Sequence, residues 1–463
     1  MNSLIGREKE LEWLEGLFSK SGPGTCAIYG RRRVGKTALL TQFCRDKHAF
    51  FFTASQGATK EDTLRNFTET MSLFAGRDTL ASETFSGALR TFRELIGGRK
   101  TVMVIDEFPY LTQSVPGAAS DLQAFIDRGM ENTNLFLIVC GSSISSMKSE
   151  LNDKEKPLMG RFMNRTELKP LPFVECRKFH KDISDTENMA LYMMLGGIPA
   201  YHIMTEGKTF REAVTDGFLG AFPQLSEEAV SIIYRELSQS DDVIKILDAV
   251  AGGAVVQKEI AEKTGISQPQ CSNHLNSMEF LGILERETPM ADSPKRPVYH
   301  ISDSLLSFYF SLIRRRLALT GGADPDVAYE RLEHTIDSHL GHEFERVCRN
   351  YLASQIPCLS IGRWWGRIGD EDMDIDIVAI VTDGKTDCSL FAECKYSKWE
   401  TEKSVLEKLR YRSEYVRGLM NRRYVLFSKS GFDRGLTDYA EAEGVTLVTV
   451  EQMYNGAVDW RIF

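Results

Sequence analysis

The chain has 463 residues, of which 26% are charged and 42% hydrophobic. These shares are near the average for folded globular proteins, so they exclude wholesale disorder and a fibrous repeat. Lysine and arginine number 56 against 65 aspartates and glutamates, a net charge of −9. Any contact with nucleic acid must therefore be local rather than spread over the surface. At roughly 150 residues per domain, the length predicts about three domains.

The nine cysteines form no CxxC pair and are odd in number, which argues against a disulfide framework and a structural zinc site. No apolar run approaches the ~18–20 residues that span a bilayer. Residues 1–10 lack the apolar core of a signal peptide. We expect a cytoplasmic protein with no membrane contact.

Over residues 1–170, short apolar runs alternate with amphipathic helices. This alternation predicts an α/β domain with a parallel sheet covered by helices. The expected strands are rich in β-branched and aromatic residues, as strands buried on both faces are. They are Cys26–Tyr29, Ala49–Thr53, Thr101–Ile105 and Leu135–Cys140.

A phosphate-binding loop follows the first expected strand. The run Gly30-Arg31-Arg32-Arg33-Val34-Gly35-Lys36-Thr37 matches GxxxxGK[ST] in full. Its glycines let successive backbone N–H groups turn toward phosphate oxygens. Lys36 would bridge the β- and γ-phosphates, and Thr37 would bind Mg²⁺. The helix expected after the loop, Thr37–Arg45, points its positive dipole end at the same anion. The predicted nucleotide-binding residues are Gly30, Arg31, Arg32, Arg33, Val34, Gly35, Lys36, Thr37 and Ala38.

Two carboxylates end the third expected strand. Asp106 suits the Mg²⁺, and Glu107 is placed to polarise the water that attacks the γ-phosphate. Ser142, at the carboxyl end of the fourth strand, could sense the γ-phosphate or the attacking water, or it could cap the next helix. Arg161 could reach a phosphate in cis or across a subunit boundary, or it could form a surface salt bridge. Ser142, Arg161 and Glu107 are therefore candidate residues of the nucleotide site.

A family resemblance sharpens this prediction. The box Leu4-Ile5-Gly6-Arg7-Glu8-Lys9-Glu10-Leu11 resembles the N-terminal box of AAA+/STAND-type ATPases, where it helps to seat the adenine. Together with Asp106-Glu107, Gly141-Ser142-Ser143 and Gly196-Gly197-Ile198-Pro199, it resembles the archaeal-type ATPases of the STAND MNS group. The resemblance covers about the first 210 residues. It implies a sheet of the additional-strand type, ATP as the nucleotide, and a role for Arg7 in binding it.

The middle of the chain predicts a helical lid at residues 171–240 and a winged helix at 241–320. Helix 257–264, a turn at Gly265 and helix 268–281 precede two wing strands, with Ile260, Ala261, Ile266, Leu275 and Phe280 as the small core. Residues 241–300 hold six Lys/Arg and nine Asp/Glu, and the presumed recognition helix has neither lysine nor arginine. Gln268, Gln270, Asn273 and His274 could read base edges. Only Lys295 and Arg296 on the wing would contact phosphates. The alternative is a spacer or protein-contact module.

After a linker at residues 321–325, residues 326–463 carry a second group of charges. Glu345 lies beside the apolar stripe of a helix, Ile336–Tyr351. In the strand Met373–Ile380, alternation places Asp374 and Asp376 on one face. In the next strand, Glu393 and Lys395 share a face. Carboxylates in this arrangement bind hard cations such as Mg²⁺ or Mn²⁺.

The order Glu…Asp…Glu-x-Lys resembles the PD-(D/E)XK nuclease superfamily, of restriction-endonuclease-like α/β fold. The resemblance implies Asp376 and Glu393 as metal ligands, Lys395 as the catalytic lysine, and Glu345 as an accessory metal ligand. Ile375 stands where the superfamily has proline. Salt-bridged charges on an exposed sheet face, or a folded but idle site, are the alternatives. Arg363, Trp364, Trp365 and Arg367 could grip nucleic acid, or the tryptophans could belong to the core.

Three functions remain open. The first is a cytoplasmic ATPase that positions or regulates a nuclease-like domain acting on nucleic acid. The second is a signalling ATPase whose C-terminal domain only binds partners, with a homo-oligomer or another protein as candidates. The third is an ATP-responsive regulator that binds DNA through the winged helix.

Overall fold

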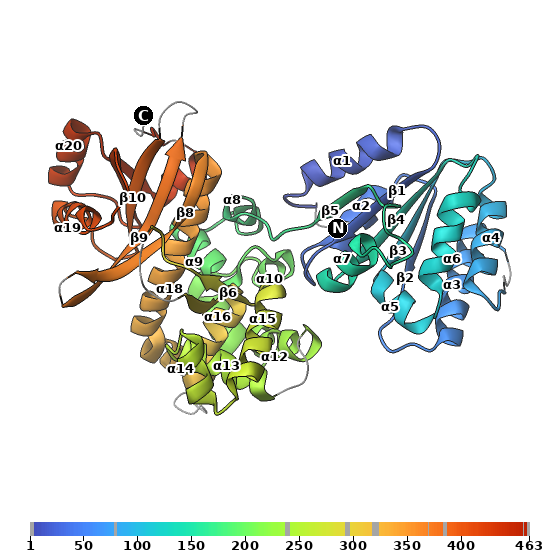
Figure 1. Cartoon of the computed structure of the whole chain (residues 1–463), viewed down its shortest axis with the longest axis horizontal. Coiled ribbons are helices and arrows are strands. Elements are labelled where there is room, and N and C mark those ends of the chain that lie inside the picture. The colour runs from blue at the N-terminus through green and yellow to red at the C-terminus, as the bar shows by residue number, and fades with distance from the viewer. Residues whose placement is uncertain are drawn as a thin grey trace. The chain divides into compact units, whose positions relative to one another are not determined.

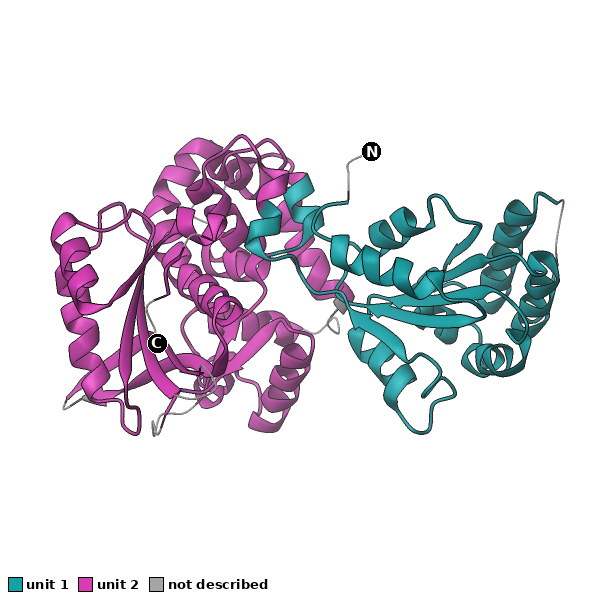
Figure 2. Cartoon of the chain, turned by 90° about the horizontal axis from the view of Figure 1, so that it is seen from above, with its two compact units in different colours: residues 1–176, 197–203 teal, residues 177–196, 204–463 magenta. Residues whose placement is uncertain are grey.

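The computed structural model describes residues 4–77, 81–236, 241–291, 297–316, 324–368, 370–382, 387–456 and 458–460 (Figure 1). The chain forms two compact units, residues 1–176 with 197–203 and residues 177–196 with 204–463 (Figure 2). Lys295, Arg296 and residues 321–323 of the expected linker lie outside the described residues. Within the described ranges, no helix is long and apolar enough to cross a membrane.

The first unit is built on a five-stranded parallel sheet of order β2-β3-β4-β1-β5. The four predicted strands are confirmed as β1 (Gly24–Tyr29), β2 (Ala49–Thr53), β3 (Thr101–Asp106) and β4 (Leu135–Gly141). The fifth strand, β5 (Asn164–Glu167), was not predicted because its residues are polar and it lies at the sheet edge. Because β4 lies between β1 and β3, the sheet has the additional strand that the sequence resemblance implies.

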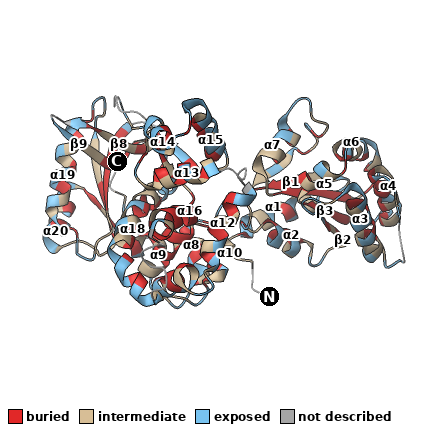
Figure 3. Ribbon diagram, turned by 90° about the horizontal axis from the view of Figure 1, so that it is seen from below, coloured by how far each residue is buried: buried red, intermediate tan, exposed pale blue. Residues whose placement is uncertain are grey.

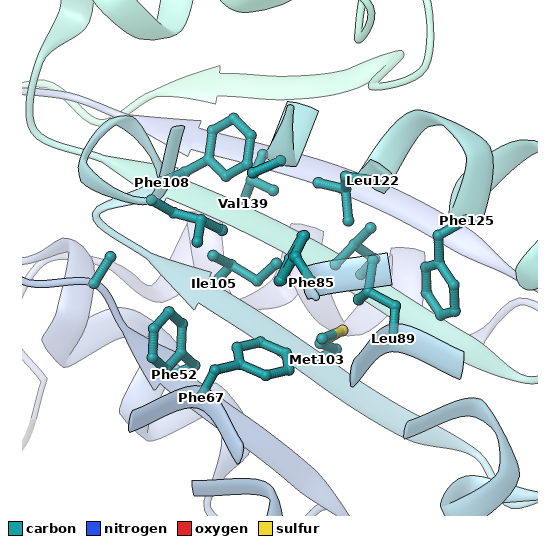
Figure 4. Packing of buried hydrophobic residues seen from close by; sticks show 14 of the residues in the cluster. Phe52, Phe67, Phe85, Leu89, Met103, Ile105, Phe108, Leu122, Phe125 and Val139 are labelled. Carbon is teal, nitrogen blue, oxygen red and sulfur yellow. The ribbon is translucent and has the colours of Figure 1, made fainter. Parts of the chain in front are cut away.

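The helices around this sheet are α1 (Glu8–Ser19), α2 (Lys36–Cys44), α3 (Lys60–Ala75), α4 (Phe85–Ile96), α5 (Phe108–Ser114), α6 (Ala118–Ala124) and α7 (Ile144–Asn152). The short helix α8 (Phe173–Cys176) and most of α10 (Pro199–Met204) also belong to the first unit. Phe52, Phe67 and Phe85 pack together in the core that α3 and α4 form with β2 and β3 (Figure 4). The central strands β1 and β3 are buried along most of their length (Figure 3).

The second unit begins with helices: α9 (Asp185–Leu195), α11 (Phe210–Val214), α12 (Gln224–Glu236), α13 (Asp241–Ala251), α14 (Gln257–Thr264) and α15 (Gln268–Phe280). The predicted hairpin follows as β6 (Leu284–Glu287) and β7 (Val298–Ile301), which pair antiparallel. The prediction that Phe280 belongs to the core is wrong, because its side chain is 58% exposed. The buried stripe of α15 runs through Cys271, Leu275 and Met278, and Phe280 lies off that stripe.

The chain continues through α16 (Ser304–Phe308) and short turns that end in η5 (Arg314–Arg316) to the long helix α18 (Pro325–Gln355). The predicted apolar stripe of α18 is confirmed, since Ile336, Leu340, Phe344, Val347 and Tyr351 are all buried. A mixed sheet of order β12-β11-β10-β9-β8 comes next. Its strands are β8 (Cys358–Ile368), β9 (Glu371–Thr382), β10 (Asp387–Lys395), β11 (Arg422–Ser428) and β12 (Thr446–Thr449). The remaining helices are α19 (Lys403–Glu414), α20 (Arg434–Glu443) and α21 (Val450–Asn455).

Candidate active sites

The phosphate-binding loop joins β1 to α2 in a conformation that its residue types permit. Gly30 has φ +154°, and a Cβ there would lie 2.4 Å from the carbonyl oxygen of Leu168. Arg33 and Gly35 also have positive φ angles, +62° and +99°. Helix α2 begins at Lys36, so its first N–H groups lie at the end of the loop, with Thr37 and Ala38 exposed in its first turn. The backbone therefore has the glycine-dependent turn that phosphate binding requires.

The polar groups of this site come from the loop, the first turn of α2 and the end of β3. The buried Lys36 ammonium donates to the carbonyl oxygens of Gly30 at 2.8 Å and Arg31 at 2.9 Å. Burial lowers the pKa of Lys36. The Thr37 hydroxyl donates to Asp106 Oδ2 at 2.9 Å. The residues predicted to bind Mg²⁺, Thr37 and Asp106, are therefore in contact, and their hard oxygens fit that ion.

Glu107 occupies a constrained position beyond the end of β3. Its φ of +52° is unusual for a residue with a side chain, and its backbone N–H donates to Asp106 Oδ1 at 2.9 Å. Ser142, at the end of β4, donates to Glu107 Oε2 twice, from its hydroxyl at 2.8 Å and from its backbone N–H at 3.1 Å. The cap of α7 is Ser143, whose hydroxyl accepts from the N–H of Ser146 at 3.3 Å. Of the two interpretations of Ser142, capping therefore belongs to its neighbour, and Ser142 orients Glu107.

Arginines around the loop have protein partners. The Arg7 guanidinium donates to the carbonyl oxygens of Val34 at 2.9 Å and Lys169 at 2.7 Å, and to Glu10 at 3.1 Å. Arg7 is buried, and it holds the loop through the carbonyl group of Val34. Arg32 contacts the hydroxyl of Tyr110. Arg7 thus positions the loop, a role that the adenine-seating interpretation of its box did not include.

The C-terminal carboxylates lie on neighbouring strands. Ala392 on β10 pairs with Ile377 on β9, so the next pair in this antiparallel register sets Glu393 opposite Asp376. Both side chains are buried, and Asp376 Oδ2 accepts from the N–H of Cys394 at 2.8 Å. Burial raises the pKa of Asp376, and the negative charges of Glu393 and Glu345 raise it further. Asp376 and Glu393 are therefore brought together as predicted.

Two cations lie beside Glu393. Lys395 Nζ lies 2.8 Å from Glu393 Oε1, and Arg412 Nη1, from α19, lies 3.4 Å from the same oxygen. Burial would lower the pKa of Lys395, but the Glu393 carboxylate outweighs burial, and the pKa lies above its ordinary value.

The predicted third metal ligand does not join them. Glu345 lies 3.7 Å from Arg363 Nη2 and 3.5 Å from His342 Nδ1. Among the residues that the structure describes, no three His, Cys, Asp or Glu side chains gather as a metal site would need. Glu393 and Glu345 instead face arginines and a lysine, and the role of Glu345 as an accessory metal ligand stays a prediction.

The predicted nucleic-acid grip near β8 is also corrected in part. Trp364 is buried in the core of the C-terminal sheet, so its indole cannot stack on a base. Arg363 pairs with Asp374 at 3.1 Å, and the exposed Arg367 with Asp370 at 3.5 Å. Trp365 lines a cavity of about 530 Å³ whose wall also includes Arg363, Asp374 and, from the hairpin, Tyr299. No pattern in the sequence indicates that the hairpin reaches this face.

Comparisons with known proteins identify the first site. Residues 4–204 match a family described as an ATPase domain predominantly from Archaea. A Walker-type ATPase of Pyrococcus abyssi has a solved structure that covers 66% of this chain and 96% of its own, with 19% identity and a TM-score of 0.50. Residues 4–204 carry a P-loop ATPase domain. An uncharacterised ATP-binding protein of Methanocaldococcus jannaschii is 42% identical over 43 residues, 9% of this chain and 73% of that protein.

The rest of the chain has relatives without an assigned activity. Residues 309–407 match a family described as archaeal and bacterial proteins of unknown function. An uncharacterised protein of Methanocaldococcus jannaschii is 27% identical over 461 residues, 98% of this chain and 97% of that protein. Its coverage extends the likeness through both units. Because neither description assigns chemistry to the C-terminal region, the nuclease resemblance stays a prediction.

One predicted residue lies far from the ATPase site. Arg161 pairs with Asp127 through two hydrogen bonds of 2.9 and 2.8 Å, and its carbonyl oxygen accepts from Thr25 at the start of β1. The nucleotide loop leaves the other end of that strand. The prediction that Arg161 reaches a phosphate in cis is therefore wrong, and the salt-bridge alternative describes it.

The ATPase site includes one segment that motif reasoning did not assign to it. Residues 197–203 return to the first unit after an excursion into the second. A Cβ on Gly197 would lie 1.9 Å from the Leu171 carbonyl oxygen, and a Cβ on Gly35 would lie 3.9 Å from Pro199 Cγ. Pro199 therefore packs beside the phosphate-binding loop. The signal was present in the Gly196-Gly197-Ile198-Pro199 run, which the resemblance singled out without a role.

Proposed function

We propose that ATP binding and hydrolysis in the first unit govern a metal-dependent nuclease-like centre in the second, formed by Asp376, Glu393 and Lys395. The observation that carries the proposal is the pair of buried carboxylates on adjacent strands with a lysine 2.8 Å from one of them. Mg²⁺ is held in many sites by one or two protein carboxylates together with substrate phosphates. Two carboxylates therefore suffice, and Glu345 is not needed as a ligand.

In the ATP site, Thr37 and Asp106 would hold Mg²⁺, which neutralises charge on the phosphates when bound. Lys36 neutralises the γ-phosphate, and Glu107 takes the proton of the attacking water. Ser142 holds the Glu107 carboxylate through two hydrogen bonds. Hydrogen bonds hold both the backbone N–H and the carboxylate of Glu107. The carboxylate therefore keeps one orientation toward the attacking water.

At the C-terminal centre, Asp376 and Glu393 would hold Mg²⁺ or Mn²⁺, which activates water when bound. Lys395, half-exposed and charged, would stabilise the negative charge that develops on a phosphate. The helices α13 to α15 with the β6–β7 hairpin resemble a winged helix, and we assign them a coupling role. Their hairpin contacts the C-terminal domain through the Glu287–Arg349 ion pair and through the Met290 N–H, which donates to the Arg363 carbonyl at 2.7 Å.

Cleavage of single- and double-stranded oligonucleotides with Mg²⁺ or Mn²⁺, with and without ATP, tests the proposal. We expect ATP-dependent cleavage that Glu393→Gln and Lys395→Ala abolish. Lys398→Ala, an exposed lysine three residues beyond Lys395, is the matched control and should cleave normally. Cleavage that survives Lys395→Ala refutes the assignment.

A second candidate function is an ATP-driven switch whose C-terminal domain only binds a partner. The charge of Glu393 is already compensated by Lys395 and Arg412, which favours this alternative. Calorimetric titration with Mn²⁺ in the Lys36→Ala background separates the two, because that change disables the nucleotide site. Metal binding that Asp376→Asn removes supports the nuclease-like centre, and no metal binding supports the switch.

A further inference from the structure

A basic cleft lies on the helical part of the second unit, away from the residues assigned above. It has a volume of about 650 Å³. Its wall combines α13, the end of α14 and the turn η5. The lining residues are Lys245, Asp248, Ala249, Lys263, Thr264, Arg314 and Arg315. All of these residues belong to one compact unit, so their juxtaposition is fixed by its fold.

The charge of this cleft is opposite to that of the whole chain. Four cations and one carboxylate give 4 − 1 = +3, whereas the chain carries −9. Asp242 lies 3.2 Å from Lys245 at the rim and offsets part of this charge. A local positive cleft on a negative protein attracts anions selectively to that place. The count over residues 241–300 missed it because Arg314 and Arg315 arrive from beyond that window.

Protein contacts hold the cations in place. Arg315 Nη1 donates to the carbonyl oxygen of Ala251 at 2.9 Å, and Lys263 Nζ donates to that of Gly252 at 3.2 Å. Arg314 Nε lies 3.1 Å from Asp248 Oδ1. These contacts use one of the three ammonium hydrogens of Lys263 and one of the five guanidinium hydrogens of Arg315. The side chains are thus pre-oriented around the cleft, with donors beyond those the contacts use.

A purely structural role would be to cap the carboxyl end of α13, where cations interact well with terminal carbonyls. Capping accounts for one contact each from Lys263 and Arg315. Lys245 and Arg314 are paired with Asp242 and Asp248. The carbonyl groups that Lys263 and Arg315 cap are neutral, so the positive charges of these two residues stay in the cleft. Proteins contact a phosphodiester backbone through cations that several elements bring to one place.

We propose that this cleft binds backbone phosphates of a nucleic acid and so holds the strand on the second unit. The inference rests on the proposed function for its choice of nucleic acid over other anions, and it adds the place of contact. Sequence reasoning sought the contact on α15, which carries no lysine or arginine. The cleft supplies the positive charge that α15 lacks, from α13, the carboxyl end of α14 and η5.

Binding of a fluorescent oligonucleotide, single-stranded and duplex, to the full chain tests this inference by anisotropy. All variants carry Glu393→Gln, so that the probe is not cut and binding is measured apart from cleavage. Adding Lys263→Gln and Arg315→Gln keeps a donor for each α13 carbonyl but removes two charges. We expect roughly tenfold weaker binding or more, and a salt dependence whose slope falls by about two between about 50 and 200 mM salt.

Lys258→Gln is the matched control, because Lys258 is an exposed lysine of α14 outside the cleft. It should leave affinity and slope unchanged. Equal affinity of the double variant and the parent, or no binding by the parent at about 50 mM salt, overturns the cleft assignment. The cleft assignment is also overturned if polyglutamate competes with the oligonucleotide as well as inorganic polyphosphate does. Binding that depends on the cleft, in a chain whose wild type does not cleave, would refute the nuclease and leave the cleft intact.

Discussion

Replacing Glu107 with glutamine should separate ATP binding from ATP hydrolysis. Glutamine keeps the shape of the side chain, and its carbonyl oxygen can still accept the two hydrogen bonds from Ser142. It cannot accept a proton from water. General-base catalysis contributes about 10²–10⁴-fold, so we expect kcat to fall by that factor, or about 3–5 kcal/mol in barrier height. ATP affinity should change less than about threefold, because Lys36 and the loop N–H groups are untouched.

Steady-state phosphate release and equilibrium binding of a fluorescent ATP analogue measure the two quantities. Ser142→Ala tests the positioning half of the argument. It removes the 2.8 Å bond and leaves the backbone N–H bond. A hydrogen bond to a charged group is worth roughly 1.5–3 kcal/mol, so kcat should fall about 10- to 100-fold at unchanged affinity. Glu131→Gln is the control, because Glu131 lies in the turn before β4, at the amino end of that strand, and this variant should keep the wild-type kcat. A Glu107→Gln enzyme with the wild-type kcat, or one impaired in ATP affinity alone, would refute the reasoning.

Three further outcomes are expected. Gly30→Ala places a Cβ 2.4 Å from the Leu168 carbonyl oxygen, so both the melting temperature and ATP affinity should fall, as scanning fluorimetry with and without ATP will record. Burial lowers the pKa of His180 to about 4. The unfolded chain, with a histidine pKa of about 6.5, then binds more protons as pH falls, and unfolding free energy should drop by about 2 kcal/mol between pH 7 and 5. Denaturant titration should show that His180→Gln removes this part of the pH dependence, and an unchanged dependence contradicts it. Asp376→Asn relieves a buried like-charge interaction with Glu393 and should raise the melting temperature while removing the proposed cleavage, whereas Asp374→Asn, at a half-exposed side chain, should leave the melting temperature unchanged.

Local patterns predicted much of the fold. The three central strands β1, β3 and β4 are apolar because both faces are covered, and the stripe of α18 repeats at helical spacing, so both follow from the sequence pattern. The polar edge strand β5 has no such pattern and was missed. Phe280 was placed in the core because it is apolar, but its position along α15 puts it outside the buried stripe. The position of Phe280 on the helix, and not its apolar side chain, determines that it is exposed.

The candidate sites were predictable only as far as their residues are neighbours in sequence or in strand register. The phosphate-binding loop is one continuous segment, and the parity of Asp376 and Glu393 follows from alternation. Contacts with residues from other elements could not be predicted from the sequence. Ser142 follows β4 and contacts Glu107, which follows β3, and Arg412 on α19 contacts Glu393 on β10. A sequence gives the side of a strand on which a carboxylate lies, but not which cation will pair with it.

The two centres differ in what a ligand must displace. Lys36 donates to two neutral carbonyl oxygens, and a phosphate oxygen competes well against them because charge-assisted hydrogen bonds are roughly twice as strong as neutral ones. Glu393 instead faces Lys395 and Arg412, so a metal ion must compete with two positive charges. A phosphate therefore replaces only neutral partners of Lys36, whereas a cation at the proposed C-terminal centre would bind more tightly once Arg412 has moved away. If ATP governs this centre as proposed, helix α19, which carries Arg412, is the element whose displacement would do so.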